Sequence, residues 1–345
     1  MNYKVIVDSI EESDWERHAG GFADYSIYQT WAYQRVRGEM DRQEVSRAVV
    51  TGSNGQAVTM CQMRIKCFKP LGLKIGYVQW GPLFRRLDGT NKCTAKALRC
   101  LVNAYLGGRV NVLRVVPNAE ANHIGCEFAA MLESAGFEYV KSVRPYFTMT
   151  LPVNGTEEEI RSRLHRSWRR GLNKAEQNGL EIKEGPDSEY LELLEKMYVE
   201  AKKRKGFRGL NPREFIRTQE LLAAEEKMNA IAVYHNGRVV TVHVSSHLGD
   251  TAVGTLAASN EEGLRYGSSY LVWWKTFLAA KRAGIKRYDL GGIDPKGNFE
   301  VYQFKQRMGA RQCQYIGAYE ICTNSVVEDI WHLAERTYRL VKKEQ

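Results

Sequence analysis

Two distant parts of the chain share one pattern of apolar and polar positions. Residues 48–59 and 230–241 each contain two apolar runs on either side of an Asn-Gly pair, at 54–55 and 236–237. Asn-Gly between such runs predicts a β-hairpin, because both central residues of its turn adopt positive φ. After each hairpin the pattern continues with a strand, a helical segment and a further apolar run, at 110–116 and 285–290.

This repeat predicts a mixed α/β (α+β) fold with two domains of like topology, and 345 residues are enough for both. We expect residues 1–152 to form the first domain, residues 318–345 to pack back on it, and residues 153–317 to form the second. A groove between two such domains is a natural place for a ligand. The pattern alone leaves duplication open, because any mixed α/β chain contains hairpins that can be matched.

A basic helix is predicted immediately after the join between the domains. Thr156 and Glu159 fit a capping box, in which a hydroxyl and a carboxylate satisfy backbone donors at a helix start. We expect one helix from there to about residue 177. Its apolar positions are Leu164, Trp168, Leu172 and Ala175, and its other face carries Arg163, Arg166, Arg170 and Lys174. This basic stripe predicts either a phosphate-binding surface or an ordinary solvated helix face.

The overall charge indicates which class of binding partner the protein attracts. The chain has 50 Lys and Arg residues against 40 Asp and Glu residues, a net charge of +10. Such a surface attracts anions, among them RNA, nucleotide-linked molecules and acidic lipid headgroups. No apolar run approaches the ~20 residues of a membrane span, and acidic residues stand where a secretory signal needs an apolar run. We therefore expect a cytoplasmic protein.

Several kinds of active site lack their sequence motifs. The chain contains no GxGxxG, Walker, HExxH or GxSxG sequence, which argues against dinucleotide, nucleoside-triphosphate, zinc-protease and serine-hydrolase sites. Its seven cysteines form no CxxC pair, so we expect reduced, buried thiols and no metal. His243 and His247 fall on one face of a predicted strand and could bind a metal ion together, but no third metal ligand lies near them in the sequence.

The segment 288–309 combines a strand, a glycine turn and a helix. The strand ends in Gly291 and Gly292, which permit positive φ and the close approach of a ligand. A helix start follows at Asn298 and offers free backbone N–H groups, which suit an anion or a developing oxyanion. Lys305 lies on that helix. The alternative is an ordinary tight turn followed by a solvated lysine.

The chain resembles the Fem family of peptidoglycan interpeptide-bridge enzymes in this region. Residues 288–320 read YDLGGIDPKGNFEVYQFKQRMGARQCQYIGAYE and are similar to that family's pattern of Asp, paired Gly, a Phe-Lys step, a further Gly and a closing Ile-Gly-x-Tyr strand. Looser matches at 28–31, 77–82 and 169–179 extend the resemblance over nearly the whole chain. It implies two tandem GNAT-like domains without the helical coiled-coil arm of some members, and an aminoacyltransferase that uses aminoacyl-tRNA.

The resemblance also implies roles for individual residues. Lys305 would stabilise the reacting carbonyl with Phe304 beside it. Apart from the resemblance, Asp289 and Asp294 are candidates for accepting or relaying the amine proton, although carboxylates at a strand end also commonly cap the next helix. The acceptor, a UDP-linked or lipid-linked muropeptide, would meet the residues Arg35, Arg37, Tyr77, Arg204, Arg208, Arg213, Gly291, Gly292 and Asn298. The tRNA would meet the basic stripe of Arg163, Arg166, Arg170 and Lys174. No cofactor or metal is implied, and peripheral contact with the inner face of the membrane is expected.

Two alternatives remain beside this hypothesis. An acyl-CoA-dependent N-acyltransferase that acts on a polysaccharide or lipid precursor would use the same scaffold, although residues 264–269 keep only the middle glycine of the CoA-binding pattern. The second alternative is a basic protein that binds RNA or a membrane and catalyses no reaction. The sequence leaves open which amino acid is transferred, whether the acceptor is lipid-linked, and the oligomeric state.

Overall fold

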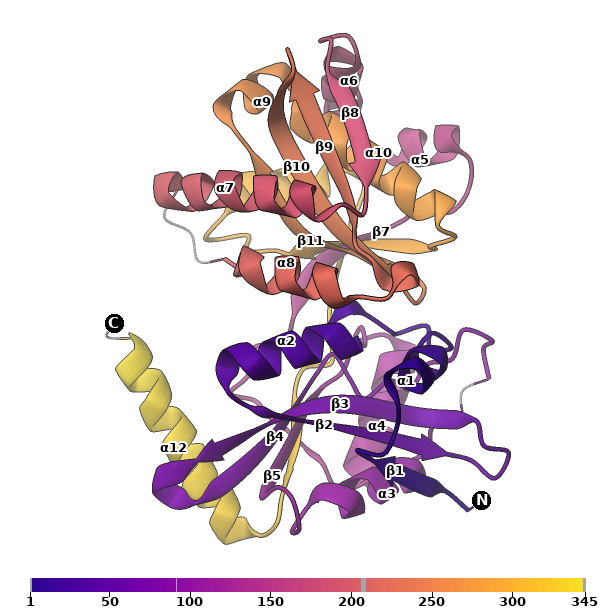
Figure 1. The fold of residues 1–345 in the computed structure, drawn as a ribbon, viewed down its shortest axis with the longest axis vertical. Coiled ribbons are helices and arrows are strands. Elements are labelled where there is room, and N and C mark those ends of the chain that lie inside the picture. Colours follow the sequence, from indigo (N-terminus) through magenta and orange to yellow (C-terminus); the bar gives the residue numbers. More distant parts are fainter. Residues whose placement is uncertain (1, 91, 206–208, 344–345) are drawn as a thin grey trace. The chain divides into compact units, whose positions relative to one another are not determined.

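The computed structural model describes residues 2–90, 92–205 and 209–343, which form two compact units (Figure 1). The first unit combines the segment up to Ala19 with Arg37–Pro145 and the segment from Tyr315 onward. The second combines Gly20–Val36 with Tyr146–Gln314. Each unit contains one seven-stranded sheet, which confirms the predicted mixed α/β class with two sheets of like topology.

The sheet of the first unit has the order β1-β2-β3-β4-β5-β14-β6. All neighbours are antiparallel except β4 and β5, which are parallel. The strands are Lys4–Val7 (β1), Glu44–Thr51 (β2), Ala57–Phe68 (β3), Leu73–Gln79 (β4), Val112–Val116 (β5), Glu138–Tyr139 (β6) and Tyr319–Cys322 (β14). The helices are Glu12–Ala19 (α1), Ala95–Tyr105 (α3), His123–Ser134 (α4) and Ser325–Lys343 (α12), and Trp31–Asp41 (α2) runs from the second unit into the first.

The sheet of the second unit has the order β13-β7-β12-β11-β10-β9-β8. Again one neighbouring pair is parallel, here β11 and β12. The strands are Phe147–Pro152 (β7), Glu181–Gly185 (β8), Asn229–His235 (β9), Arg238–Leu248 (β10), Thr251–Ser259 (β11), Arg287–Gly292 (β12) and Arg311–Gln314 (β13). The helices are Glu157–Arg163 (α5), Arg166–Glu176 (α6), Ser188–Lys205 (α7), Pro212–Leu221 (α8), Glu261–Tyr266 (α9), Ser268–Arg282 (α10) and Phe299–Gln306 (α11).

The two sheets match strand for strand and exchange one strand each. The predicted hairpins are β2–β3 and β9–β10, and in the second the turn residues Asn236 and Gly237 have φ of 49° and 75°. In the first sheet β14, from near the end of the chain, lies between β5 and β6. In the second, β7 lies at the equivalent place between β12 and β13. The strand at 147–152, which we expected in the first domain, thus belongs to the second sheet.

The segment 20–36 also differs from the expected boundary, because it belongs to the second unit. The hydroxyl of Tyr25 bonds to Glu226, and that of Tyr33 bonds to Glu214. Ile27 and Tyr33 are buried in the same apolar cluster as Phe215 on α8. Buried tyrosines require such partners for their hydroxyls, and these partners tie the segment to α8 and the region before β9.

Two short helices replace the single basic helix that we expected over 156–177. The capping box of Thr156 and Glu159 is present, and α5 starts there. The chain becomes extended at Leu164, and His165 then caps α6, its Nδ1 accepting from the N–H of Ser167 at 3.2 Å. The expectation of one continuous helix was wrong because the imidazole of His165 satisfies a backbone donor and starts a new helix. The apolar positions 164, 168, 172 and 175 are all buried, as predicted.

No protruding arm is present in the described part of the second unit. Helices α7 and α8 pack on each other, and α7 lies against β10 and β11 (Figure 1). Helix α10 packs on β9, β10 and α6, which explains why it is apolar on nearly all sides. Among the described helices, none is both long enough and apolar enough to cross a bilayer.

Candidate active site

A pocket of about 450 Å³ lies where β11 and β12 of the second unit separate. These parallel strands pair over 251–253 and 287–289, and beyond that point residues 254–259 and 290–292 line the pocket. The corresponding strands of the first unit, β4 and β5, pair over 75–79 and 112–116 and are extended by a bridge between Gly81 and Val116. The second sheet is therefore open at the place where the first is closed.

Lys305 brings a positive charge into this pocket. It stands in the last turn of α11, and its side chain is only 8% exposed. The ammonium donates hydrogen bonds of 3.0 Å to the carbonyl oxygens of Gly291 and Gly292. An ammonium has three donors, and the described residues use two of them, which leaves one N–H for a ligand. The geometry thus presents a fixed cation with one unused donor in the space between the strands.

The protonation of Lys305 depends on two opposing effects. Burial lowers its pKa from 10.5 to about 8, and the negative charge of Asp289 acts in the opposite direction. Asp289 is fully buried, and its Oδ1 accepts from the hydroxyl of Thr148 at 2.5 Å and from the N–H of Gly291 at 2.8 Å. The structure therefore places Asp289 behind the glycine turn, outside the pocket wall, and its role as a proton acceptor stays a prediction.

Phe304, the predicted partner of Lys305, also lines the pocket. Its ring lies 5.2 Å from the ring of Tyr270 and 6.0 Å from that of Trp168, measured between centroids. These aromatic contacts hold α11 against α6 and α10. Phe304 thus fixes the helix that carries the ammonium and covers part of the pocket with apolar surface.

His243 on β10 is a pocket residue whose place in the wall the sequence did not show. It is 1% exposed, and burial, with smaller contributions from His247 and Lys305, lowers its pKa to about 3. The ring is therefore neutral at physiological pH. His247, on the same strand, bonds to the hydroxyl of Ser245 at 3.0 Å. No group of His, Cys, Asp and Glu in the described chain could hold a metal ion.

The remaining pocket residues explain how the wall is built. The β-bulge between Val244 and Ser245 shifts the register of β10 against β11 next to Gly254. Leu264 and Ser269 extend the lining to the start of α10, the stretch with the partial CoA-binding pattern. Hydroxyl side chains line the pocket at Thr241, Thr255, Ser259 and Ser269, and the described lining includes no Asp, Glu or Cys. In the sequence, Gly254 is an isolated glycine within a β pattern, and this is the signal that could have located the β11 side of the wall.

Of the other predicted site residues, Gly291, Gly292 and Asn298 join Lys305 in the pocket. Asn298 caps α11, its side chain accepting from the N–H of Val301 at 3.4 Å.

The predicted arginines and Tyr77 lie elsewhere. Arg35 and Arg213 belong to the second unit but do not line the pocket, and Arg213 pairs with Glu195 at 2.8 Å. Arg37 and Tyr77 belong to the first unit. Arg37 pairs with Asp41 at 2.6 Å, and Tyr77 lies under the guanidinium of Arg64. The side chain of Arg204 and the whole of Arg208 lie outside the described residues.

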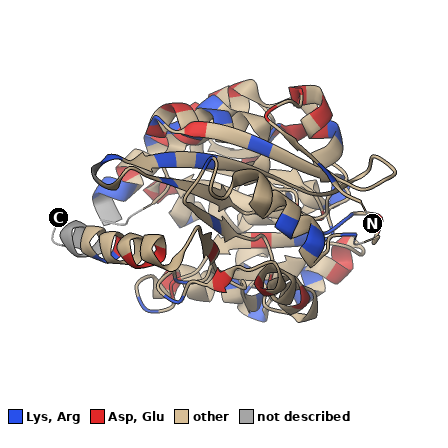
Figure 2. Cartoon of the chain, turned by 90° about the horizontal axis from the view of Figure 1, so that it is seen from below, with Lys and Arg blue, Asp and Glu red and all other residues tan. Residues whose placement is uncertain are grey.

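The basic stripe is exposed but is divided between two helices. Arg163 stands on α5 and bonds to the carbonyls of Pro152 and Asn154, each at 3.3 Å. Arg166, Arg170 and Lys174 follow one another on the exposed face of α6. Elsewhere on the ribbon, basic and acidic positions are interspersed (Figure 2). The stripe on α6 is thus a local feature of the second unit, and its binding of tRNA stays a prediction.

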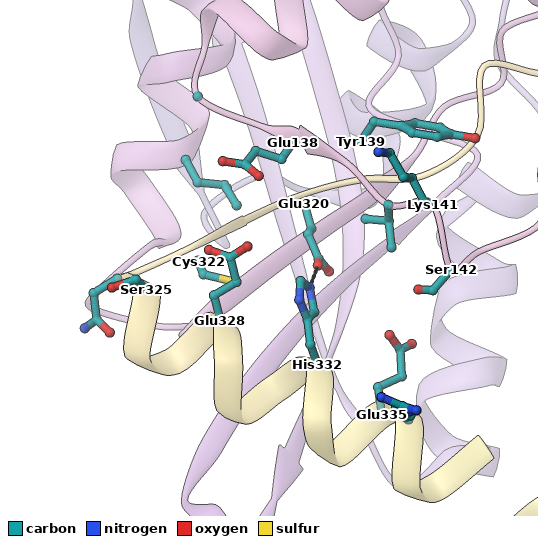
Figure 3. A pocket seen from close by; sticks show the side chains of 15 residues that line it. Glu138, Tyr139, Lys141, Ser142, Glu320, Cys322, Ser325, Glu328, His332 and Glu335 are labelled. Carbon is teal, nitrogen blue, oxygen red and sulfur yellow. Dashed lines mark hydrogen bonds and ion pairs between the residues drawn. The ribbon is translucent and has the colours of Figure 1, made fainter. Parts of the chain in front are cut away.

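The first unit has a second pocket, of about 790 Å³, between β6, β14 and α12 (Figure 3). Two of the lining residues are bound by Arg114 of β5, with bonds of 2.8 and 2.5 Å to Glu320 and of 2.6 and 3.0 Å to Glu335. Figure 3 shows His332 pointing from α12 to Glu320, to which it is hydrogen-bonded. None of our predicted site residues lines this pocket. Its ion-pair network fastens the last helix to the sheet.

All seven cysteines are free, as expected, but they differ in burial. Cys61, Cys93 and Cys313 are buried, whereas Cys67 and Cys126 are exposed, so the expectation of buried thiols was wrong for these two. No cysteine side chain lines the pocket of Lys305. Thiol chemistry therefore has no place in the candidate site.

Comparison with known proteins identifies the fold. Residues 161–306 match the family of acetyltransferase (GNAT) domains, and no curated protein matches the chain in sequence. The structure is similar to the crystal structure of FemX, with a TM-score of 0.81 at 14% identity over 96% of this chain and 99% of that one.

Two further solved structures share the fold at lower similarity. L-PGS from Bacillus licheniformis has a TM-score of 0.52 at 13% identity, over 96% of this chain and 97% of that one. The C-terminal domain of a putative lysylphosphatidylglycerol synthetase from Agrobacterium fabrum has a TM-score of 0.51 at 9% identity, over 93% and 96%. The chain thus has the FemX-like tandem GNAT fold that the resemblance implied, and residues 161–306 of its second unit are similar to acetyltransferase (GNAT) domains.

Proposed function

We propose that the protein transfers an amino acid from aminoacyl-tRNA to an amino group of a peptidoglycan precursor, a UDP-linked or lipid-linked muropeptide, and so forms an interpeptide bridge. The observation that carries the proposal is the ammonium of Lys305, fixed by two glycine carbonyls with one donor unused in the pocket. The reaction needs no cofactor, because the ester on the tRNA is already activated.

The chemistry is an attack of the acceptor amine on the ester carbonyl. A new C–N bond forms, the ester C–O bond breaks, and the proton lost by the amine ends on the ribose hydroxyl that leaves. Negative charge develops on the carbonyl oxygen in the tetrahedral intermediate, and the third N–H of Lys305 stabilises it there. Alignment and charge stabilisation are then the main contributions of the protein.

The pocket wall is consistent with direct transfer without a covalent enzyme intermediate. The hydroxyl of Thr255 donates to the carbonyl of Val244 at 2.8 Å, and the hydroxyls of Ser259 and Ser269 bond to each other at 3.2 Å. None of these three pairs with His243, whose Nδ1 lies 3.4 Å from the hydroxyl of Thr276. A nucleophilic serine or threonine needs a base within hydrogen-bond reach, and the described pocket does not supply that arrangement.

The structural neighbours support an amino acid as the transferred group. FemX covers nearly the whole chain, and two other neighbours are named for lysylphosphatidylglycerol, a lipid that carries an amino acid. The exposed basic residues of α6 give the second unit a surface of the sign that tRNA phosphates require.

Acyl-CoA is the alternative donor, and two observations favour it. Residues 161–306 match acetyltransferase domains, and the pocket extends to Ser269 at the N-terminus of α10, where backbone N–H groups suit a phosphate. The acceptor would then be a polysaccharide or lipid precursor.

One assay separates the two donors. The purified protein is incubated with UDP-linked muropeptide and either a mixture of charged tRNAs or acetyl-CoA, and the product is identified by mass. We expect a mass increase of one aminoacyl residue with charged tRNA, formed about 100- to 1,000-fold more slowly when Lys305 is replaced by Met. An acetylated product from acetyl-CoA, with none from charged tRNA, contradicts the proposal.

A further inference from the structure

Three groups surround an open space above Gly254 in the pocket. A Cβ built on Gly254 would lie 3.4 Å from each of three atoms: Nε2 of His243, Cη2 of Trp273 and the hydroxyl oxygen of Tyr288. Glycine leaves this space empty. His243 and Trp273 line the pocket together with Gly254, so the space is part of the same pocket as Lys305.

The hydrogen bonds of Thr276 fix which nitrogen of His243 carries the proton. The hydroxyl of Thr276 donates to the carbonyl of Val272 at 2.8 Å, so its oxygen is left to accept. Nδ1 of His243 lies 3.4 Å from that oxygen and therefore carries the proton. In a neutral ring the other nitrogen, Nε2, is then an acceptor. It has no hydrogen-bond partner among the described residues.

Two neighbouring glycines connect the surroundings of His243 and Lys305: Gly254 lies next to Nε2 of His243, and Gly291 lies next to Nζ of Lys305. A Cβ built on Gly291 would lie 3.3 Å from the carbonyl oxygen of Gly254 and 3.7 Å from Nζ of Lys305. The charge of Lys305 is near enough to lower the pKa of His243. Lys305 and His243 also line the same pocket, so a bound acyl group whose carbonyl oxygen meets Lys305 shares that pocket with Nε2 of His243.

We infer that Nε2 of His243 accepts a hydrogen bond from the α-amino group of the aminoacyl donor. This inference rests on the proposed function and deepens it, because it names the residue by which the site prefers an aminoacyl ester to a plain acyl ester. In an aminoacyl group the α-nitrogen is two bonds from the carbonyl carbon, so one group can reach Lys305 and His243 together. An acetyl or propionyl group has no donor at that position.

The neutral state of His243 suits this task. The α-amino group of an ester lies close to the positive charge of Lys305, which favours its uncharged form, and an uncharged amine still donates an N–H. A plain acyl group leaves the buried acceptor Nε2 of His243 without a hydrogen bond. The free energy lost in this way corresponds to roughly a 10- to 100-fold discrimination against the plain acyl donor.

The test compares donors that differ only in the α-amino group. One tRNA is loaded with glycine, alanine or serine, small groups that the space above Gly254 admits, and in parallel with acetyl, propionyl or 3-hydroxypropionyl. The quantity measured is the ratio of kcat/KM for the best aminoacyl donor to that for its deamino counterpart. We expect the wild-type protein to prefer the aminoacyl donor about 10- to 100-fold.

Variants of His243 connect the preference to this side chain. We expect His243→Leu to reduce the ratio to near one, and His243→Gln, whose amide oxygen can accept, to restore part of it. Gly254→Ala places a methyl group in the space and should reduce the ratio without unfolding the protein, because its contacts of 3.4 Å are ordinary. The matched control is His247→Gln, at a partly buried histidine on the same strand that does not line the pocket.

The outcomes separate the inference from the proposed function. A structural loss at residue 243 slows both donors equally and leaves the ratio unchanged. If the wild type prefers aminoacyl donors and His243→Leu retains that preference, the inference is overturned while the proposed function stands. If the wild type makes no product from any charged tRNA but acetylates an acceptor, both are overturned.

Discussion

Lys305 donates a hydrogen bond of 3.0 Å to the carbonyl of Gly291, and this contact ties helix α11 to the end of strand β12. The φ of Gly291 is 80°, a conformation that residues with a Cβ rarely adopt, and a side chain there would also approach Nζ. A glycine is thus required at position 291, because only this backbone conformation directs the carbonyl toward the ammonium of Lys305. Four predictions follow from the charge placed there and from the basic face of α6.

Replacing Lys305 with Met should lower kcat about 100- to 1,000-fold, because the intermediate loses the cation that stabilises its oxyanion. The KM for the muropeptide should change little, since the cation contributes mainly in the transition state. Steady-state kinetics with charged tRNA measure both. Lys296→Met, at an exposed lysine outside the pocket, is the control. A kcat equal to that of the wild type would remove Lys305 from the mechanism.

The contribution of Lys305 should disappear at high pH. Its pKa is about 8, so the ammonium is present below that pH and is lost above it. The ratio of wild-type kcat to that of Lys305→Met should be constant below pH 7 and should decrease as the pH rises through 8. Taking the ratio cancels the ionisation of the acceptor amine, which both proteins share. A ratio that increases with pH would instead indicate a neutral lysine acting as a base.

Lys305 should make the folded protein less stable at neutral pH. Its pKa falls from 10.5 in the unfolded chain to about 8 in the folded one, so the unfolded chain binds the proton more tightly. This lowers the free energy of unfolding by about 3 kcal/mol below pH 8, an effect that decreases between pH 8 and 10.5. Lys305→Met lacks this titrating group and also the two hydrogen bonds to the glycine carbonyls, so the pH dependence is the quantity to measure. The stability of the wild type relative to Lys305→Met should increase as the pH rises from 8 to 10.5, and a stability difference that stays constant over this range in denaturant titrations would contradict the prediction.

The basic face of α6 should contribute to tRNA affinity through phosphate contacts. Changing Arg166 and Arg170 together to Gln should weaken binding and reduce the slope of log affinity against log salt by about one to two. Filter binding at several salt concentrations measures the slope. Lys74→Gln, at an exposed lysine of the first unit, is the control. Equal slopes for the wild type and the double variant would leave these arginines as solvated surface.

The sequence was sufficient for the elements whose signals are local. The Asn-Gly hairpins, the capping box and the strand-turn-helix around Lys305 all depend on neighbouring residues, and the structure confirms them. The break at Leu164 and His165 was missed, although it is also local, because the apolar spacing continues across it. Periodicity alone does not report a second cap.

The contribution of His243 could not be predicted in the same way. Its tautomer depends on Thr276, 33 positions away, and the space it faces depends on Gly254 in the adjacent strand. The register of β10 against β11 brings Gly254 near His243, and the packing of α10 on β10 brings Thr276 there. The neutral state is likewise a consequence of complete burial, which no short motif announces.

The exchange of β7 and β14 has a consequence for synthesis on the ribosome. The ladder between β5 and β6 is completed by residues 319–322, so the sheet that begins at Lys4 remains unfinished until residue 322 has been made. The later-made sheet, in contrast, has all its strands once residue 314 has emerged. The C-terminal half can therefore reach its native topology first, and a nascent chain stalled before β14 would expose an open strand edge to chaperones or to aggregation.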